Sequence, residues 1–470
     1  MPRRRDPDAP RVVHRTARIG LRTTRAQRDR CYGLLRSAGD VWACALELNW
    51  WRWRRGHMPV VSCQALFREL AAAGPGTFDD LDSTGARSVL RRYSDAWFAT
   101  AKRRKAGDLT ARYPRRRRSL VPVRYYHGTF TLQHRRLRLP TTAGRAPLWL
   151  RLDRAAPYPA EQIRSVSLLA DGGRLWVEVT AEVPVATYAD CQAPDPARVA
   201  GVDLGVIHPY AVAGPDGAGL LVSGRAIRAE HRMHLTDTKQ RCRATAKRAP
   251  APGQRGSRRW RKTRRRARLI EGRHRRRVRQ AGHEAAKAVV AWAVRHRIGT
   301  LTVGDPRGAL QVKAGHRHNL RLRQWQVGRA IAVLRDKAEL AGITVHLVDE
   351  RGTSSTCPTC WQRIRKPAGR TTVCPHCATS GHRDLVAAAI IATRTPGGGS
   401  APPTASLSRV VTHRRAGRHL PGAGPSRRDP RRPPPATKVV SGRGSVGRLR
   451  PAPPPTVMGS RSTASCGEEP

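Results

Sequence analysis

Two closely spaced pairs of cysteines constrain the fold of this chain more than any other feature. Cys357 and Cys360 enclose Pro-Thr, Cys374 and Cys377 enclose Pro-His, and thirteen residues separate the two pairs. This spacing lets four thiolates converge tetrahedrally on one Zn²⁺ and leaves no open position for catalysis. Four unligated thiols are the alternative, but a reducing cytosol gives chance pairs no reason to keep this geometry. We therefore predict one structural zinc ion held by these four cysteines.

The charge of the chain indicates its partner. The 470 residues include 90 Lys and Arg but only 33 Asp and Glu, which gives a net charge of +57. Such a charge repels itself unless a polyanion lies against it, so nucleic acid is the expected partner. The longest uninterrupted apolar run, Leu385 to Ala392, is far too short to span a bilayer. We expect a cytoplasmic, nucleoid-associated protein without a membrane partner.

Basic residues are densest in one helical stretch. Between Arg255 and Arg279 there are 14 Lys or Arg, and Glu271 is the only acid. A helix that is merely solvated normally mixes the two signs, whereas a helix that binds phosphates does not. The residues predicted to contact nucleic acid are Arg258, Arg259, Arg261, Lys262, Arg264, Arg265, Arg266, Arg275 and Arg276.

Three tryptophans, Trp50, Trp51 and Trp53, alternate with arginines in a stretch of helical apolar spacing. Such rings can stack on nucleic-acid bases. Aromatic residues at helical spacing lie more often in a core, and core packing is the prediction for these three.

The first half of the chain has the pattern of strands interrupted by helices. Val12 to Arg22 alternates like a strand. Helical spacing follows in Ala26 to Arg54, Cys63 to Ala73 and Ala86 to Ala101. Further strands are predicted at Val121 to Thr129, Leu132 to Leu139 and Leu148 to Leu152, and in a hairpin from Ser165 to Val179 that turns at Asp171-Gly172-Gly173. This order predicts a small antiparallel barrel with the helices inserted in it.

From Arg198 onward the pattern is that of an α/β domain. Helical stretches are predicted at Ala285 to Arg295 and Gln324 to Ala341. Apolar strands are predicted at Val199 to Val206, Tyr210 to Ala213, Leu220 to Ser223, Thr300 to Val303 and Ile343 to Val348. A mixed sheet flanked by helices follows from this order. The last stretch, Thr395 to Pro470, holds 14 of the 36 prolines and only three acids, and is predicted to be disordered.

Two carboxylates lie in apolar surroundings. Asp203 interrupts the hydrophobic strand Gly201 to Val206, and Asp384 opens an apolar helix after the second cysteine pair. A carboxylate in such a place is costly unless it binds a cation or a hydrogen-bond donor. The alternatives to a metal-binding role are a hydrogen-bonded strand end for Asp203 and a helix N-cap for Asp384.

These motifs together resemble the TnpB (OrfB) family of insertion-sequence proteins, compact relatives of type V CRISPR effectors. The resemblance extends from about Thr16 to Thr393. It rests on Gly201-Val-Asp-Leu-Gly205, the basic helix, the segment Gln324 to Gly342 running into Ile343, Thr353 to Cys360 with the second cysteine pair, and Arg383-Asp384 with the following alanine-rich helix.

The resemblance implies an RNA-guided DNA endonuclease encoded by a transposable element. Guide RNA and target DNA would be its partners, and its cofactors would be one structural zinc ion and two catalytic Mg²⁺ ions. Two alternatives remain: a nuclease-inactive RNA-guided DNA-binding protein of the same family, or an accessory transposase protein.

The resemblance also implies a multidomain architecture of α+β and α/β parts. These are an N-terminal arm with the first barrel strand (1–22), a helical recognition insertion (23–115), a wedge-type β-barrel (116–190), an RNase H-like (RuvC) nuclease domain (196–394) with a zinc ribbon inserted at 353–381, and a disordered Pro- and Arg-rich tail (395–470).

The sequence departs from the family at the second catalytic acid. Gly304 stands where members usually have Glu, and Val386 replaces the Asn usually found two residues after Asp384. A two-metal nuclease needs several carboxylates around its cations, and Asp203 and Asp384 supply two of them. If the chain cleaves, its third acid must therefore come from another position.

Glu350 is the preferred third acid and Asp305 the alternative, with loss of cleavage as a third outcome. Glu350 follows the strand Ile343 to Val348, which in an RNase H-like sheet should pair beside Thr300 to Val303. Neighbouring strand ends are only about 4.8 Å apart, so Glu350 can reach the place of the missing Glu. Otherwise Asp305 only shapes a turn and Glu350 only pairs with Arg351.

Overall fold

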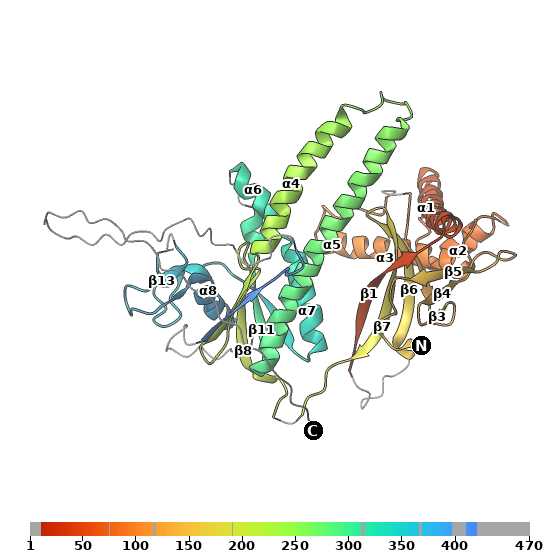
Figure 1. Ribbon diagram of the computed structural model, residues 1–470. Helices are drawn as coiled ribbons and strands as arrows, with labels where there is room; N and C mark the ends of the chain where they lie inside the picture. Colours follow the sequence, from red (N-terminus) through yellow and green to blue (C-terminus); the bar gives the residue numbers. More distant parts are fainter. Residues whose placement is uncertain are drawn as a thin grey trace, which may run out of the picture. The chain divides into compact units, whose positions relative to one another are not determined.

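The computed structural model describes residues 11–74, 76–115, 119–189, 191–311, 315–365, 369–396 and 410–420 (Figure 1). All of them lie within one unit, Met1–Gly424. The finer domain divisions stay predictions. Throughout these ranges, every helix is too short or too polar to cross a bilayer.

The first half of the chain forms a curled, seven-stranded half-barrel sheet in which every pairing is antiparallel, in the order β2-β6-β7-β1-β5-β4-β3. The predicted strand from Leu132 to Leu139 is in fact two strands, because His134 adopts a left-handed φ of 50° and turns the chain between them. The bounds are β1 (Val12–Arg22), β2 (Val123–Tyr126), β3 (Thr131–Gln133), β4 (Arg136–Leu139), β5 (Leu148–Leu152), β6 (Ile163–Asp171) and β7 (Arg174–Pro184).

Three helices, α1 (Arg25–Arg54), α2 (Cys63–Ala71) and α3 (Ser83–Lys105), share a core with this sheet. Helix α1 begins with a capping box between Thr24 and Gln27. Its buried residues end at Asn49. The core prediction for Trp50, Trp51 and Trp53 is therefore wrong, because these rings lie beyond the packed part of the helix and are 45%, 46% and 74% exposed.

The second sheet has six strands in the order β12-β11-β8-β9-β10-β15. Strands β8, β9 and β10 are antiparallel, β11 and β12 run parallel to β8, and β15 runs parallel to β10. The predicted mixed sheet is confirmed, and so is the pairing of the two late strands. The bounds are β8 (Asp195–Asp203), β9 (Tyr210–Ala213), β10 (Ala218–Ser223), β11 (Ile298–Asp305), β12 (Thr344–Asp349) and β15 (Val410–Arg415).

Strand β15 corrects the prediction of a disordered tail. All six of its residues pair with β10, and Val411 packs against a small apolar cluster that includes Leu221 and Leu385. The local composition could not reveal this strand, because it depends on a distant sheet edge that offers hydrogen-bonding groups. Of the predicted tail, 397–409 and 421–470 lie outside the described residues.

Helices cover both faces of the second sheet. Val202 and Leu301 point towards α5 and α7, whereas Gly201, the neighbour of Val202, faces α8. Helices α4 and α5 run side by side (Figure 1). The bounds are α4 (Arg225–Ala246), α5 (Arg258–Arg295), α6 (His316–Gln324), α7 (Val327–Leu340) and α8 (Arg383–Ala392), with a small hairpin of β13 (Thr371–Val373) and β14 (Ser380–His382) and single turns η1 (Ala160–Gln162), η2 (Pro306–Gln311) and η3 (Thr353–Ser355).

Candidate active site

Asp203 and Asp384 are brought to the same edge of the six-stranded sheet. Helix α8 crosses β8 at Gly201, where an added Cβ would lie 1.8 Å from the carbonyl oxygen of Ala388. Only glycine allows this approach. From the crossing, Asp203 is two strand residues away, about 6.6 Å. Asp384 is four helix residues away, about 6 Å. The charge of Asp384 accordingly acts on Asp203.

Glu350 reaches this edge from β12. Strands β11 and β12 pair Gly304 with Val348, so Glu350 follows at the end of the ladder. A Cβ added to Gly304 would lie 3.1 Å from the Cβ of Glu350 and 3.3 Å from its Oε2. The Glu350 side chain therefore occupies the space that a side chain at position 304 would need. Its Oε2 is buried and has no hydrogen-bond partner in the described part of the chain.

The three carboxylates form a group of like charges. Burial, together with the charges of Asp384 and Glu350, raises the pKa of Asp203 to about 8. Burial and the charges of Asp305 and Asp349 raise the pKa of Glu350 to about 7. Carboxylate oxygens are the hard donors that suit Mg²⁺. The donor set therefore fits the predicted metal.

The carboxylate of Asp384 is held by His208, Arg370 and Arg383. Nδ1–H of His208 donates to Oδ2 of Asp384 at 2.8 Å, and the backbone N–H of Asp384 donates to Nδ1 of His382 at 3.2 Å. Burial alone would raise the pKa of Asp384, but the His208 hydrogen bond and the charges of His382 and Arg370 outweigh it and lower that pKa. The N-cap of α8 is His382. The N-cap interpretation of Asp384 is therefore wrong.

Asp305 is held by its own turn. Nε of Arg307 lies 2.8 Å from both carboxylate oxygens of Asp305, and the Arg307 backbone N–H donates to Oδ1. These hydrogen bonds lower the pKa of Asp305. By contrast, no ion pair to Glu350 is present in the described ranges, and the backbone N–H of Arg351 donates to Asp349 instead. The turn-shaping interpretation thus describes Asp305 well, whereas pairing with Arg351 does not describe Glu350.

The four predicted cysteines lie together. Their Sγ atoms are all within 4.8 Å of one another, with 3.6 Å between Cys357 and Cys377 and 3.5 Å between Cys360 and Cys374. Four sulfurs around a zinc ion at about 2.3 Å would be about 3.8 Å apart, so the cluster has the size of a zinc site. Val386 of α8 packs against this cluster, which joins it to the helix that carries Asp384.

Helix α5 presents most of the predicted nucleic-acid contacts to solvent. Eight of the nine residues are exposed. Arg276 differs, because its guanidinium lies over the ring of Trp176 at 5.0 Å and its NH1 is buried without a hydrogen-bond partner. Arg276 therefore joins α5 to the β6–β7 hairpin.

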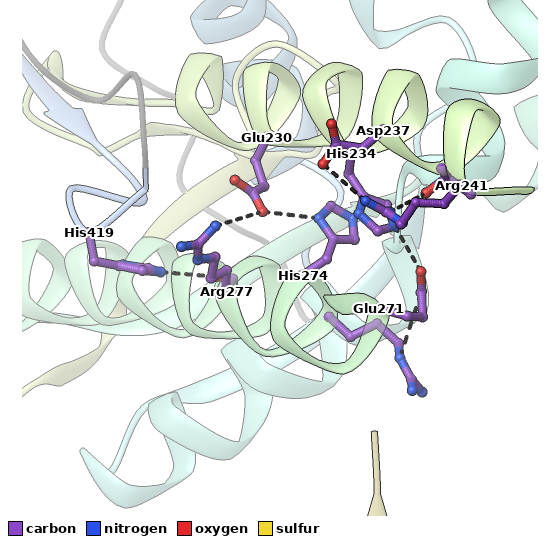
Figure 2. Close-up of polar contacts among 10 residues, drawn as sticks. Glu230, His234, Asp237, Arg241, Glu271, His274, Arg277 and His419 are labelled. Carbon is purple, nitrogen blue, oxygen red and sulfur yellow. Dashed lines mark hydrogen bonds and ion pairs between the residues drawn. The ribbon is translucent and has the colours of Figure 1, made fainter. Parts of the chain in front are cut away.

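Buried and partly buried histidines and glutamates connect α4 to α5 (Figure 2). Nδ1 of His274 lies 3.1 Å from Glu230, Nε2 of His234 lies 2.7 Å from Glu271, and the two imidazole rings stack at 3.8 Å. Burial, followed by the charges of His274 and His234, lowers the pKa of His231 to about 4. The exposed basic face of α5 is thus carried on a pair of helices with a polar, partly buried seam between them.

Comparisons with known proteins agree with this arrangement. Residues 177–310 match the family model OrfB_IS605, described as a probable transposase, and residues 328–391 match the TNB domain of Cas12f1-like proteins. A cryo-EM structure of a Cas12f1–sgRNA–target DNA complex has the same fold, with a TM-score of 0.56 and 13% identity over 78% of this chain and 82% of that one. This is a TnpB-like protein.

Two further solved structures are similar at a lower level. CasPhi-2 (Cas12j) bound to crRNA has a TM-score of 0.44 and 10% identity, over 84% of the TnpB-like chain and 99% of its own. The mini-RNA-guided endonuclease Cas_phi3 has a TM-score of 0.41 and 11% identity, over 81% and 92%. No curated protein matches the chain.

The matched segments contain every predicted acid and cysteine of this TnpB-like chain. Asp203 and Asp305 lie in the transposase segment, and Glu350, the cysteines and Asp384 lie in the TNB segment. The sequence analysis missed His208, which contacts Asp384 across the sheet edge. Its position five residues after Asp203 was the available signal, since the loop that follows a strand end stays near it.

Proposed function

We propose that this chain is an RNA-guided, Mg²⁺-dependent DNA endonuclease of a transposable element, with Asp203, Glu350 and Asp384 as its metal-binding acids. The observation that carries the proposal is the group of three carboxylates at one sheet edge, two of them with raised pKa values. Like charges gathered there lower the stability of the fold unless a cation lies between them.

Each side chain at the sheet edge has a separate role in this proposal. Asp203 and Glu350 offer oxygens from two strand ends, and Asp384 offers its oxygens from the first turn of α8. His208 holds Asp384 in one orientation by donating to Oδ2. A pair of bound divalent cations would activate the attacking water and stabilise the leaving oxygen of a phosphodiester.

The remaining features support the choice of substrate. The exposed basic face of α5 suits a phosphate backbone, which fixes position without reading sequence. The similar Cas12f1 structure was determined with sgRNA and target DNA. In such systems base pairing with the guide reads the sequence while the protein binds the backbone. One zinc ion on the four cysteines would hold the segment that precedes α8.

The test is guided cleavage by the chain assembled with RNA from the end of its own element. The wild-type complex should cut plasmid DNA that matches the guide, and a changed guide segment should move the cut. Asp203→Ala should abolish cutting while it retains RNA, and Asp305→Asn serves as the matched acid control. Undiminished cutting by Asp203→Ala would contradict the proposed site. RNA-dependent binding without any cutting by the wild type would instead indicate a nuclease-inactive relative.

A further inference from the structure

A cavity beside the carboxylate edge has a strongly basic lining. It has a volume of about 160 Å³ and is lined by the β8–β9 loop, α4, α5, α6 and α7. Gly205 and Val206, two and three residues after Asp203, form part of its wall. The cavity therefore lies next to the strand end that carries the first proposed metal-binding acid.

Arginines converge on this cavity, and none of the described residues that line it is an acid. Five contribute to its lining, from α4, α5, α6 and α7: Arg228, Arg232, Arg279, Arg321 and Arg329. Among the described residues, none of the five forms an ion pair with a carboxylate, although arginines elsewhere, such as Arg18 and Arg198, do. Mutual repulsion of this kind is relieved when an anion binds.

The environment of two of these arginines indicates that the cavity suits an anion. Burial, followed by the charges of Arg321 and Arg232, lowers the pKa of Arg228. Burial, followed by the charges of Arg18 and Arg329, lowers the pKa of Arg279. Nε of Arg279 is also buried without a hydrogen-bond partner. A guanidinium in this state is a ready donor for a phosphate oxygen.

The rest of the lining is largely apolar. The partly exposed Trp325 contributes an aromatic ring, and Ile227, Val278 and Val333 contribute aliphatic side chains. Convergent guanidinium groups beside an aromatic ring suit a phosphate joined to a flat base. Because the cavity lies between helices, a base enters it only when it is unstacked from its neighbours.

We propose that this cavity binds one nucleotide of the single-stranded DNA being cut, next to the scissile phosphate, with the arginines on its phosphate and Trp325 against its base. The inference rests on the proposed function, since the position beside Asp203 selects DNA over RNA. It adds a positioning site for the substrate strand to the proposed metal-binding acids.

Photo-crosslinking tests the position of the strand. The Asp203→Ala chain, bound to its RNA, is irradiated with single-stranded DNA that contains 5-iododeoxyuridine, and the adducts are mapped by mass spectrometry. We expect an adduct at Trp325. Adducts only on the exposed face of α5 would overturn the proposal. An adduct at Trp325 from iodouridine placed in the RNA, with none from DNA, would also overturn it.

Binding measurements with charge-matched variants test the arginines in the same Asp203→Ala background. Arg228→Gln with Arg329→Gln should weaken binding of the DNA roughly tenfold or more. It should also reduce the log-log salt slope by about 0.7 for each phosphate that is no longer neutralised. The control, Arg136→Gln with Arg151→Gln, removes the same charge from exposed residues of β4 and β5. Equal weakening by both pairs would overturn the proposal.

Neither measurement depends on cleavage. Cutting by Asp203→Ala would contradict the proposed function. The crosslinking and binding results alone determine whether the cavity binds the DNA strand.

Discussion

The two sheets of this protein treat their acids in opposite ways. In the seven-stranded sheet, NH1 of Arg18 lies 2.9 Å from Asp171, and its Nε lies 2.9 Å from Glu178, so one guanidinium neutralises two carboxylates. At the edge of the six-stranded sheet, burial and the charges of Asp384 and Glu350 raise the pKa of Asp203, and Oε2 of Glu350 has no hydrogen-bond partner among the described residues. Opposite charges within the chain stabilise the fold without a ligand, whereas carboxylates gathered at one place are stabilised when a cation from solution binds them.

Removing Glu350 gives the largest expected difference between the two regions. Glu350→Ala should lower guided cleavage by about 100-fold or more, because a group that stabilises transition-state charge is removed. Arg18→Gln should leave cleavage within a few fold, provided that the protein is folded. Rates of plasmid cutting by purified complexes at equal concentration check both.

A compensating substitution sharpens this result. In the Glu350→Ala background the contact with Oε2 of residue 350 is gone, and the closest remaining neighbour of a Cβ at position 304 is the terminal methyl of Ile391, at 2.7 Å, which can rotate away, so Gly304→Glu should restore part of the activity. Asp305→Asn, whose carboxylate Arg307 already holds, should have little effect. Loss of activity in Asp305→Asn, with full activity in Glu350→Ala, would reverse the assignment of the third acid.

Removal of zinc should destabilise the region of the six-stranded sheet and leave the seven-stranded sheet unchanged. Zinc binding to four cysteines supplies about 10 kcal/mol or more of folding free energy to such a segment. Cys374→Ser or a strong chelator should therefore unfold the residues around the cluster and loosen α8 through Val386. Metal analysis should find one zinc per chain, and hydrogen exchange should increase in α8 but not in β1 and β7. Unchanged exchange after complete metal removal would contradict a structural role.

Stability should change in opposite directions when one charge is removed from each sheet. Arg18→Gln removes the donor of Glu178 and one of the two arginine partners of Asp171, which also pairs with Arg275, and should lower the free energy of unfolding by about 2 kcal/mol. Asp203→Asn relieves repulsion and should raise it, by about 1 kcal/mol, in protein without divalent cations. Chemical denaturation with and without Mg²⁺ compares them, and the gain from Asp203→Asn should disappear when Mg²⁺ binds the wild type.

The raised pKa of Asp203 makes the stability of the metal-free protein depend on pH. Its pKa is raised from 3.8 unfolded to about 8 folded, so its contribution to stability is present below the lower value and is lost as the pH rises through about 8. Metal-free wild type should therefore lose more stability than Asp203→Asn does between about pH 4 and pH 8. Equal pH profiles would show that Asp203 is ionised throughout.

The sequence predicted the strand ends better than the contacts between them. Asp203 and Glu350 could be placed because apolar strands end beside them and parallel neighbours share an edge. The orienting contact from His208 and the Arg307 hydrogen bonds depend on loop conformations that no periodicity records. Strand β15 was missed for the same reason, because its partner β10 lies almost two hundred residues earlier.

The smallest expected effect concerns the seam between α4 and α5, where both kinds of charge occur. Burial lowers the pKa of His231 to about 4 and also lowers that of His274, while Glu230 partly opposes the shift in His274. A lowered histidine pKa means that stability is present above about 6.5 and is lost as the pH falls towards about 4. Hydrogen exchange in α4 should therefore rise between pH 6.5 and pH 4.5, after correction for the intrinsic rate.

The variant His231→Phe separates this effect from general acid unfolding. It keeps a ring in the seam but cannot gain a proton, so exchange in α4 should lose much of its pH dependence, while exchange in α1 should match the wild type. An unchanged α4 profile in His231→Phe would show that the seam is stabilised by its Glu–His contacts and not by neutral histidines. In that case the seam would resemble the matched charges of the seven-stranded sheet, and like-charge gathering would be confined to the carboxylate edge, the cysteine cluster and the arginine-lined cavity.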